Sequence, residues 1–590
     1  MRSVKKILTI LSGLIIVISF NSPAYSAFKD INQIAVPPKT ADGFWAPGYI
    51  GIDSAPAEQL FQFSSYLLKF NGAPGNWSKV IACSSFKSAE CAGGDLYSAR
   101  AEFQPCTNAN PTDCFKDFFV KDSKGQTLQA TLVTDKVAPF KQQFTGDQNM
   151  WLPNGGDPLV YSIPAAPHAA GDLYMVKPDV FMKYDTKIAT NFYLTKFEAG
   201  IYPIKIVPIK SKNTDDKGNL YMTSVSVDAA DYARADIVGG QGNTECDGGL
   251  NDGKNCVFRV GFPAGLTFGM TLRLSHNMYG WLHGRINNPQ VKIENNPVAS
   301  SGVDLTLVGE PMNVPVISGY IKTDTAPSNL VARFTPTPRI GGAYFPMGVF
   351  DRNAPLSTIS ISHAHMDPSE ETMAELREWL NVLGDTSTNE PSNWLVQTII
   401  GGNNDAVQKC TNDNQELAGI VTTNATTYLP GPPIYNKSQA TLDYKVMAPH
   451  FASDKSVFLG SYNLMINSKL ARCIYGFSSA PIGATVSVVA SDGTNRVATT
   501  VVSQDSKFLR LSANGFEFSD PTVQVKITQA EVKPTPSSTE AQSSTSVASP
   551  SPQVTNVAKP KTTTITCIKG KTTKKVTAVN PKCPSGYKKK

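Results

Sequence analysis

The sequence predicts a mainly β protein of multi-domain β-sandwich architecture, immunoglobulin-like, with few helices. Three observations lead to this fold class. Proline and glycine are dense, with 41 and 44 among 590 residues, and long stretches of helical periodicity are nearly absent. Short runs of alternating side chains are separated by turn residues, which is typical of β-sandwiches. The clearest alternating runs are residues 223–228, 358–361, 485–490 and 523–527.

The first 26 residues have the parts of a secretory signal peptide. Basic residues at Arg2, Lys5 and Lys6 precede an apolar run over residues 7–20. Small residues at Ala24 and Ser26 fit cleavage before the next residue. The alternative is an uncleaved anchor, but a spanning helix needs about 20 apolar residues. We therefore expect a secreted protein with no transmembrane span.

The remaining length predicts three or four domains. We expect an N-terminal β-rich region over residues 27–300, which comprises one or two domains, and a middle β region over residues 301–455. Residues 456–530 hold six candidate strands and fit an immunoglobulin-like sandwich. The strands expected there include residues 462–467, 471–477, 497–503 and 508–512, with turns at 491–493 and 513–515.

One helix is predicted over residues 368–383 in the middle region. Apolar residues recur at helical spacing, from Met373 through Leu376 and Trp379 to Leu383. Pro368 fits the first helical position after Asp367 as N-cap, and Gly384 fits the C-terminal end.

Ten cysteines indicate disulfides in an oxidising compartment. No pair has the short C-x2-C or C-x4-C spacing of zinc sites, and no histidine lies within five residues of a cysteine. Pairing between near neighbours is favoured, although neighbouring cysteines can also bond across. The expected pairs are Cys83 with Cys91, Cys106 with Cys114, Cys246 with Cys256, Cys410 with Cys473, and Cys567 with Cys583.

The net charge of +6 conceals two regions of opposite sign. Of 54 basic residues, nine are lysines from Lys561 onward and three lie in residues 1–26, and neither segment contains an acid. Residues 27–560 therefore hold 42 basic against 48 acidic residues. This acidic body disfavours nucleic acid as a partner.

A short histidine motif is the best metal candidate. His363, His365 and Asp367 form an H-x-H-x-D sequence immediately before the predicted helix. It resembles the start of the metal motif of metallo-β-lactamase-type hydrolases, but Pro368 stands where that family has its next histidine. The resemblance implies a metal held by the two histidines and, as the alternative function, a secreted metal-dependent hydrolase. The competing interpretation is a helix cap and two strand side chains.

Two further segments have weaker alternatives. The loop over residues 247–253, between Cys246 and Cys256, is rich in Asp, Asn and Gly but lacks the EF-hand pattern. We expect no cofactor there, with a structural calcium as the alternative. Tyr279 and Trp281 alternate along a predicted strand, so an exposed pair could stack on a glycan, whereas a core position is favoured.

The C-terminal end combines a Pro/Ser/Thr-rich segment with a basic module. Residues 531–563 are expected to form a disordered linker. Residues 564–590 are expected to form a hairpin module, with strands over 564–568 and 575–579 that flank a Lys-Gly-Lys turn. The lysines of this module are Lys569, Lys571, Lys574, Lys575, Lys582, Lys588, Lys589 and Lys590.

This module resembles a short Cys/Lys-rich C-terminal motif of exported actinobacterial proteins. The resemblance covers the tail alone, from Thr566 to Lys590. Compact positive charge favours anionic cell-envelope polymers or lipid head groups as partners, and a merely solubilising end is the alternative. The sequence thus favours a non-enzymatic, envelope-associated protein with a binding or structural role.

Overall fold

In this computed structural model of the protein, the structure describes most of the body and parts of the C-terminal end. The described residues are 45–50, 65–70, 80–133, 143–208, 223–227, 232–236, 248–249, 255–276, 280–296, 298, 302–322, 327–329, 368–398, 409–410, 417–477, 482–489, 495–496, 499–505, 507–518, 522–529, 563–569, 572–578, 583 and 587–589.

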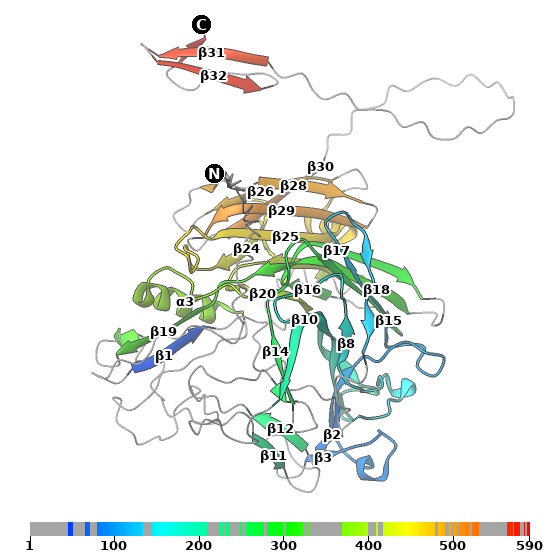
Figure 1. The fold of residues 1–590 in the computed structure, drawn as a ribbon. Coiled ribbons are helices and arrows are strands. Elements are labelled where there is room, and N and C mark those ends of the chain that lie inside the picture. The colour runs from blue at the N-terminus through cyan, green and yellow to red at the C-terminus, as the bar shows by residue number, and fades with distance from the viewer. Residues whose placement is uncertain are drawn as a thin grey trace, which may run out of the picture. The chain divides into compact units, whose positions relative to one another are not determined.

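The chain is mainly β and divides into two compact units, Met1–Glu531 and Val532–Lys590. Strands make up most of the described elements of both units (Figure 1). In the described part of the chain, no helix is long and apolar enough to cross a membrane.

One long sheet runs through the first unit. Its pairing is antiparallel except where β16 and β21 run parallel. In order across the sheet, the strands are β3 (Val80–Ala82), β2 (Tyr66–Phe70), β4 (Leu96–Glu102), β9 (Leu173–Asp185), β10 (Tyr193–Pro208), β20 (Ser392–Gln397), β16 (Gly280–Gly284), β21 (Leu417–Thr423), β25 (Leu459–Asn467), β29 (Phe508–Glu517) and β28 (Thr499–Gln504).

A second sheet packs on one end of this long sheet. It contains β6 (Thr127–Leu128), β5 (Cys114–Lys121), β15 (Thr267–Leu274), β18 (Val303–Asn313) and β17 (Ile286–Asn295). Alternate residues of both sheets form one apolar core, with Ala101, Val176 and Ile201 of the long sheet and Met270 and Leu305 of the second. Strand β18 also pairs with β20, which joins the two sheets.

Shorter strands extend the long sheet near β9 and β10. Strand β8 (Leu159–Ser162) pairs with β9 and with β7 (Thr131–Leu132). Strand β14 (Asn255–Arg259) pairs with β10 and with β13 (Gly248–Gly249).

A third sheet packs on the other end of the long sheet. It contains β22 (Thr427–Tyr428), β23 (Ile434–Asn436), β24 (Thr441–Met447), β30 (Thr522–Gln529), β26 (Ile482–Val489) and β27 (Asn495–Arg496). Its core residues Tyr444 and Val523 share one apolar cluster with Tyr462 and Leu511 of β25 and β29. Figure 1 shows these strands in yellow and orange. The strands that contribute to this cluster from the two sheets lie from residue 417 onward.

Several strand predictions in this region are confirmed and two details are wrong. Strands β25, β28 and β29 match the expected runs. Residues 471–477, expected as a strand, instead belong to helix α5 (Ser468–Tyr475) and its end, because Leu470, Ala471 and Ile474 recur at helical spacing on its buried side. The expected turn at residues 513–515 is also wrong, since β29 continues through it with Gly515 at φ 77°.

The predicted helix is present as α3 (Glu370–Leu383), with Met373, Leu376 and Trp379 buried. Gly384 ends it, as expected. The predicted N-cap is wrong, because Ser369 caps the helix: its side chain accepts a hydrogen bond from the Thr372 N–H at 3.0 Å. Pro368 therefore precedes the cap and is not the first helical residue. Asp367, the expected cap, lies outside the described residues.

Other expected elements have mixed outcomes. The run at residues 223–228 is strand β11 (Thr223–Val227), which pairs with β12 (Tyr232–Asp236). Strand β1 (Trp45–Ile50) pairs with β19 (Ile317–Lys322). The run at residues 358–361, the expected signal segment at residues 1–26 and residues 531–562 of the expected linker lie outside the described residues, whereas Thr563 belongs to β31.

Candidate functional sites

The second unit contains a three-stranded antiparallel sheet in the order β32, β31, β33. Its strands are β31 (Thr563–Lys569), β32 (Thr572–Ala578) and β33 (Lys588–Lys589), shown in red in Figure 1. The pairing of β31 with β32 matches the predicted hairpin, and β33 adds a third strand.

The register of this sheet brings lysine positions together that are far apart in the sequence. Lys574 of β32 and Lys589 of β33 both pair with Cys567, on its two sides. Neighbouring strands lie about 4.8 Å apart, so the two lysine positions are about 10 Å apart. Lys588 and Lys589 are exposed. The fold thus concentrates positive charge on one small sheet.

The disulfides of the described residues follow the neighbour pairs. Cys83 is joined to Cys91, Cys106 to Cys114, and Cys410 to Cys473. Cys583 also takes part in a disulfide, and no described cysteine is free. Cys256 lies in β14 and Cys567 in β31, whereas Cys246 lies outside the described residues.

The proposed metal ligands His363 and His365 lie outside the described residues, so their geometry stays a prediction. Among the residues that the structure does describe, no three His, Cys, Asp or Glu side chains could hold a metal ion together. The described histidines have separate surroundings: His168 contacts the Leu173 carbonyl, His276 the Trp151 ring, His283 the Tyr428 ring, and His450 the Phe518 carbonyl.

Only some residues of the candidate calcium and glycan sites lie among the described residues. Of residues 247–253, only Gly248 and Gly249 are described, as strand β13, so the acidic side chains lie outside the description. Tyr279 also lies outside it. Trp281 is half-buried and packs against the core between the long and third sheets, which fits the core interpretation.

A buried polar row, which sequence reasoning missed, crosses five strands of the long sheet. Glu102 of β4 pairs with Asp179 of β9, and Asp179 pairs with Glu198 of β10. Gln397 of β20 and His283 of β16 continue the same row. Directly opposed residues point to the same face, and all five side chains are buried there, on the side away from the apolar core.

Basic side chains lie against the carboxyl groups of Glu102 and Asp179 in this row. Arg100 donates from Nε to Asp179 Oδ2 at 3.0 Å, and its guanidinium lies 4.9 Å from the Phe181 ring. Lys177 Nζ lies 3.6 Å from Glu102 Oε1 and 3.7 Å from Asp179 Oδ2. Buried charges are costly unless they are paired in this way.

Two of the three carboxyl groups of the row, those of Glu102 and Asp179, have different surroundings. Burial raises the pKa of Glu102 to about 8, with Lys177 opposing the rise and Asp179 adding to it. Neither Glu102 oxygen accepts a hydrogen bond from the described residues. Glu102 therefore keeps a proton at neutral pH. It stands beside Asp179, whose carboxylate the Arg100 guanidinium pairs with.

A further buried cation, Arg285, lies beside His283 at the far end of the row. His283 stacks on Tyr428 with ring centroids 5.5 Å apart and contacts Tyr444 Oη through Nδ1 at 3.3 Å. Arg285 donates from one guanidinium nitrogen to the carbonyls of Thr423 and Ala425, at 2.7 and 2.6 Å. These contacts hold the end of β16 against the chain that follows β21.

Comparison of the chain with protein families, with curated proteins and with solved structures found no match in any of the three.

Proposed function

We propose that the protein is exported and held at the cell envelope by its second unit, which binds anionic envelope polymers or lipid head groups. The observation that carries this proposal is the register in which Lys574 and Lys589 lie on either side of Cys567. With no acid after residue 560, nothing in this segment offsets the charge. A compact cationic sheet attracts anionic surfaces over about a Debye length, near 8 Å at physiological ionic strength.

Three features support export. Residues 1–26 have the pattern of a signal peptide. The tail also resembles a motif of exported actinobacterial proteins. The three disulfides among the described residues of the first unit are typical of oxidising compartments outside the cytosol.

The first unit then has a binding or structural role at the envelope. Its sandwich between the long and third sheets supports an immunoglobulin-like assignment for residues 456–530, together with the strands that precede them. Rigid β-sandwiches present loops and faces to partners without conformational change.

The test is binding of the full chain to vesicles of phosphatidylcholine, with and without phosphatidylglycerol, and to a soluble phosphodiester polymer. The variant carries Lys→Gln changes at Lys574, Lys575, Lys588 and Lys589. At about 1 kcal/mol per lysine near an anionic surface, we expect binding to weaken on the order of a hundredfold or more, and high salt to have the same effect.

A charge-matched control removes four exposed lysines from the first unit: Lys124, Lys183, Lys455 and Lys526. We expect this control to bind as the unmodified chain does. Equal loss in both variants would mean that net charge alone matters, and binding that survives the tail variant would overturn the anchoring role. Comparison of the vesicle and polymer arms distinguishes lipid head groups from polymers.

A further inference from the structure

A cleft of about 480 Å³ lies beside the hairpin that joins β9 to β10. Its lining consists of Trp151 and the hairpin residues Thr186, Lys187, Ile188, Ala189, Thr190, Asn191, Phe192 and Tyr193. The lining mixes aromatic and aliphatic surface with hydroxyl and amide groups. This lining offers both apolar surface and hydrogen-bonding groups to a ligand.

Trp151 is held out to solvent in an uncommon conformation. Its side chain is 47% exposed, and its backbone has φ 59°, in the left-handed region that bulky residues seldom adopt. An exposed indole and a left-handed backbone at a bulky residue each cost folding free energy. Residues with such unusual backbone conformations are often found at binding sites.

Two neighbours fix the orientation of the indole. The His276 ring lies against it with centroids 4.5 Å apart. With the Asn191 amide oxygen turned toward the indole, Trp151 Nε1 donates to it at 3.3 Å, and the amide nitrogen donates to the Thr190 carbonyl at 2.7 Å. The aromatic face is therefore positioned before any ligand binds.

The floor of the cleft is rigid. Phe192 is fully buried, and its ring lies 5.4 Å from Tyr184 and 5.6 Å from Phe86. Phe86 lies within the loop that the Cys83–Cys91 disulfide closes.

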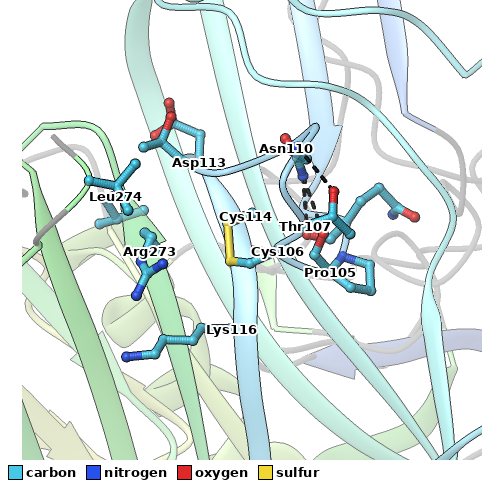
Figure 2. Close-up of a disulfide and its surroundings, with 12 residues drawn as sticks. Pro105, Cys106, Thr107, Asn110, Asp113, Cys114, Lys116, Arg273 and Leu274 are labelled. Atoms are coloured by element: carbon cyan, nitrogen blue, oxygen red, sulfur yellow. Dashed lines mark hydrogen bonds between the residues drawn. A yellow bond between two sulfur atoms is a disulfide. The ribbon is translucent and has the colours of Figure 1, made fainter.

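The residues around Trp151 and His276 contact the loop that the Cys106–Cys114 disulfide closes. Figure 2 shows this disulfide with Asp113 beside it. Asp113 Oδ1 accepts from the N–H of Ser275 at 2.9 Å, next to His276. Gln148, at the start of the 3₁₀ turn that Trp151 ends, donates to Thr112 Oγ1 at 3.3 Å. The segment that carries His276 and the turn that carries Trp151 thus both contact the loop that this disulfide closes.

We propose that this cleft binds an oligosaccharide, with one sugar ring stacked on Trp151 and its hydroxyl groups facing Thr190 and Asn191. A pyranose has an apolar C–H face that fits an aromatic ring and a hydroxyl rim that fits amides and hydroxyls. A rigid site keeps the ordering cost of binding low. The net negative charge of the body disfavours a nucleobase as the stacked group. This inference deepens the binding role proposed for the first unit.

The probes are oligomers of β-linked glucose and of β-linked N-acetylglucosamine, titrated into the full chain by calorimetry. We expect Trp151→Ala to weaken binding at least about tenfold, as for a central aromatic contact, and Trp151→Phe to weaken it less. Asn191→Ala is expected to weaken binding by releasing the indole. Leu459→Ala, which changes an apolar side chain 52% exposed on β25, is the matched surface control and should bind normally.

Thermal unfolding of each variant verifies that the fold is intact. Failure of the unmodified chain to bind either oligomer series would overturn the proposal, and so would equal binding by Trp151→Ala. The tail variant with four Lys→Gln changes should bind the oligomers normally, so loss of the anchoring role and loss of this site are distinguishable.

Discussion

Among individual residues, those of the buried polar row are the ones whose burial is hardest to predict from the sequence. Arg100 and Glu102 alternate with Ala99 and Ala101, a pattern that usually indicates a strand with one solvent-facing side. The structure buries both faces of β4. Alternation identifies the strand, but it cannot tell whether its polar face is covered, because that depends on segments distant in the chain.

The protonation of Glu102 gives the residue-scale prediction. Its pKa is raised from 4.5 to about 8 in the folded protein, chiefly by burial. Between these values the folded protein keeps a proton that the unfolded chain has released, so this residue lowers stability as pH rises through that window. Glu102→Gln cannot titrate. We expect the variant to gain about 2 to 4 kcal/mol relative to the unmodified protein between about pH 5 and about pH 9.

Urea denaturation at a series of pH values measures this difference. Glu294→Gln changes a glutamate that is 56% exposed, and we expect its difference curve to be nearly flat. A flat curve for Glu102→Gln as well would show that Glu102 is ionised when folded. A curve that is flat above about pH 5 but falls with rising pH below it would mean that the ion pairs of Glu102 outweigh its burial.

At the scale of elements, the two described helices show what local pattern can and cannot predict. The apolar spacing of α3 is regular over 14 residues, and its position was predictable. Helix α5 is only eight residues long and follows a strand directly, so its apolar residues fit a strand nearly as well. The cap of α3 was missed because Asp367 and Ser369 are both good cap residues two positions apart.

The cap of α3 gives the element-scale prediction. The Ser369 hydroxyl accepts a hydrogen bond from the Thr372 N–H in the first turn of the helix. We expect Ser369→Ala to lower the free energy of unfolding by about 1 kcal/mol, because the helix packs its Met373, Leu376 and Trp379 side chains into a core with Ile317. Chemical denaturation measures the loss.

Ser369→Asp is the matched control, since its carboxylate is also a favoured cap and suits the positive end of the helix dipole. We expect it to keep nearly the full stability. Equal losses in the two variants would contradict the assignment of Ser369 as N-cap and would return the role to a residue before it.

At the scale of the whole molecule, composition predicted the mainly β class and the charge asymmetry, and cysteine spacing predicted the pairs that are seen. The oligosaccharide cleft could not be predicted. Trp151, Asn191 and His276 are 40 or more residues apart, and only the hairpin between β9 and β10 and two disulfide-closed loops bring them together. No short motif marks such a site.

Division into two compact units gives the last prediction. Residues 27–590 have a net charge of +3. Residues 532–590 hold eleven lysines and one glutamate, so residues 27–531 alone have a net charge of −7. We expect a chain ending at Glu531 to melt at the same temperature as the full chain, because its core residues all precede that point. It should bind an anion exchanger at neutral pH, whereas the full chain binds a cation exchanger through its lysines. A lower melting temperature in calorimetry would show that the second unit packs on the first and is not a separate module.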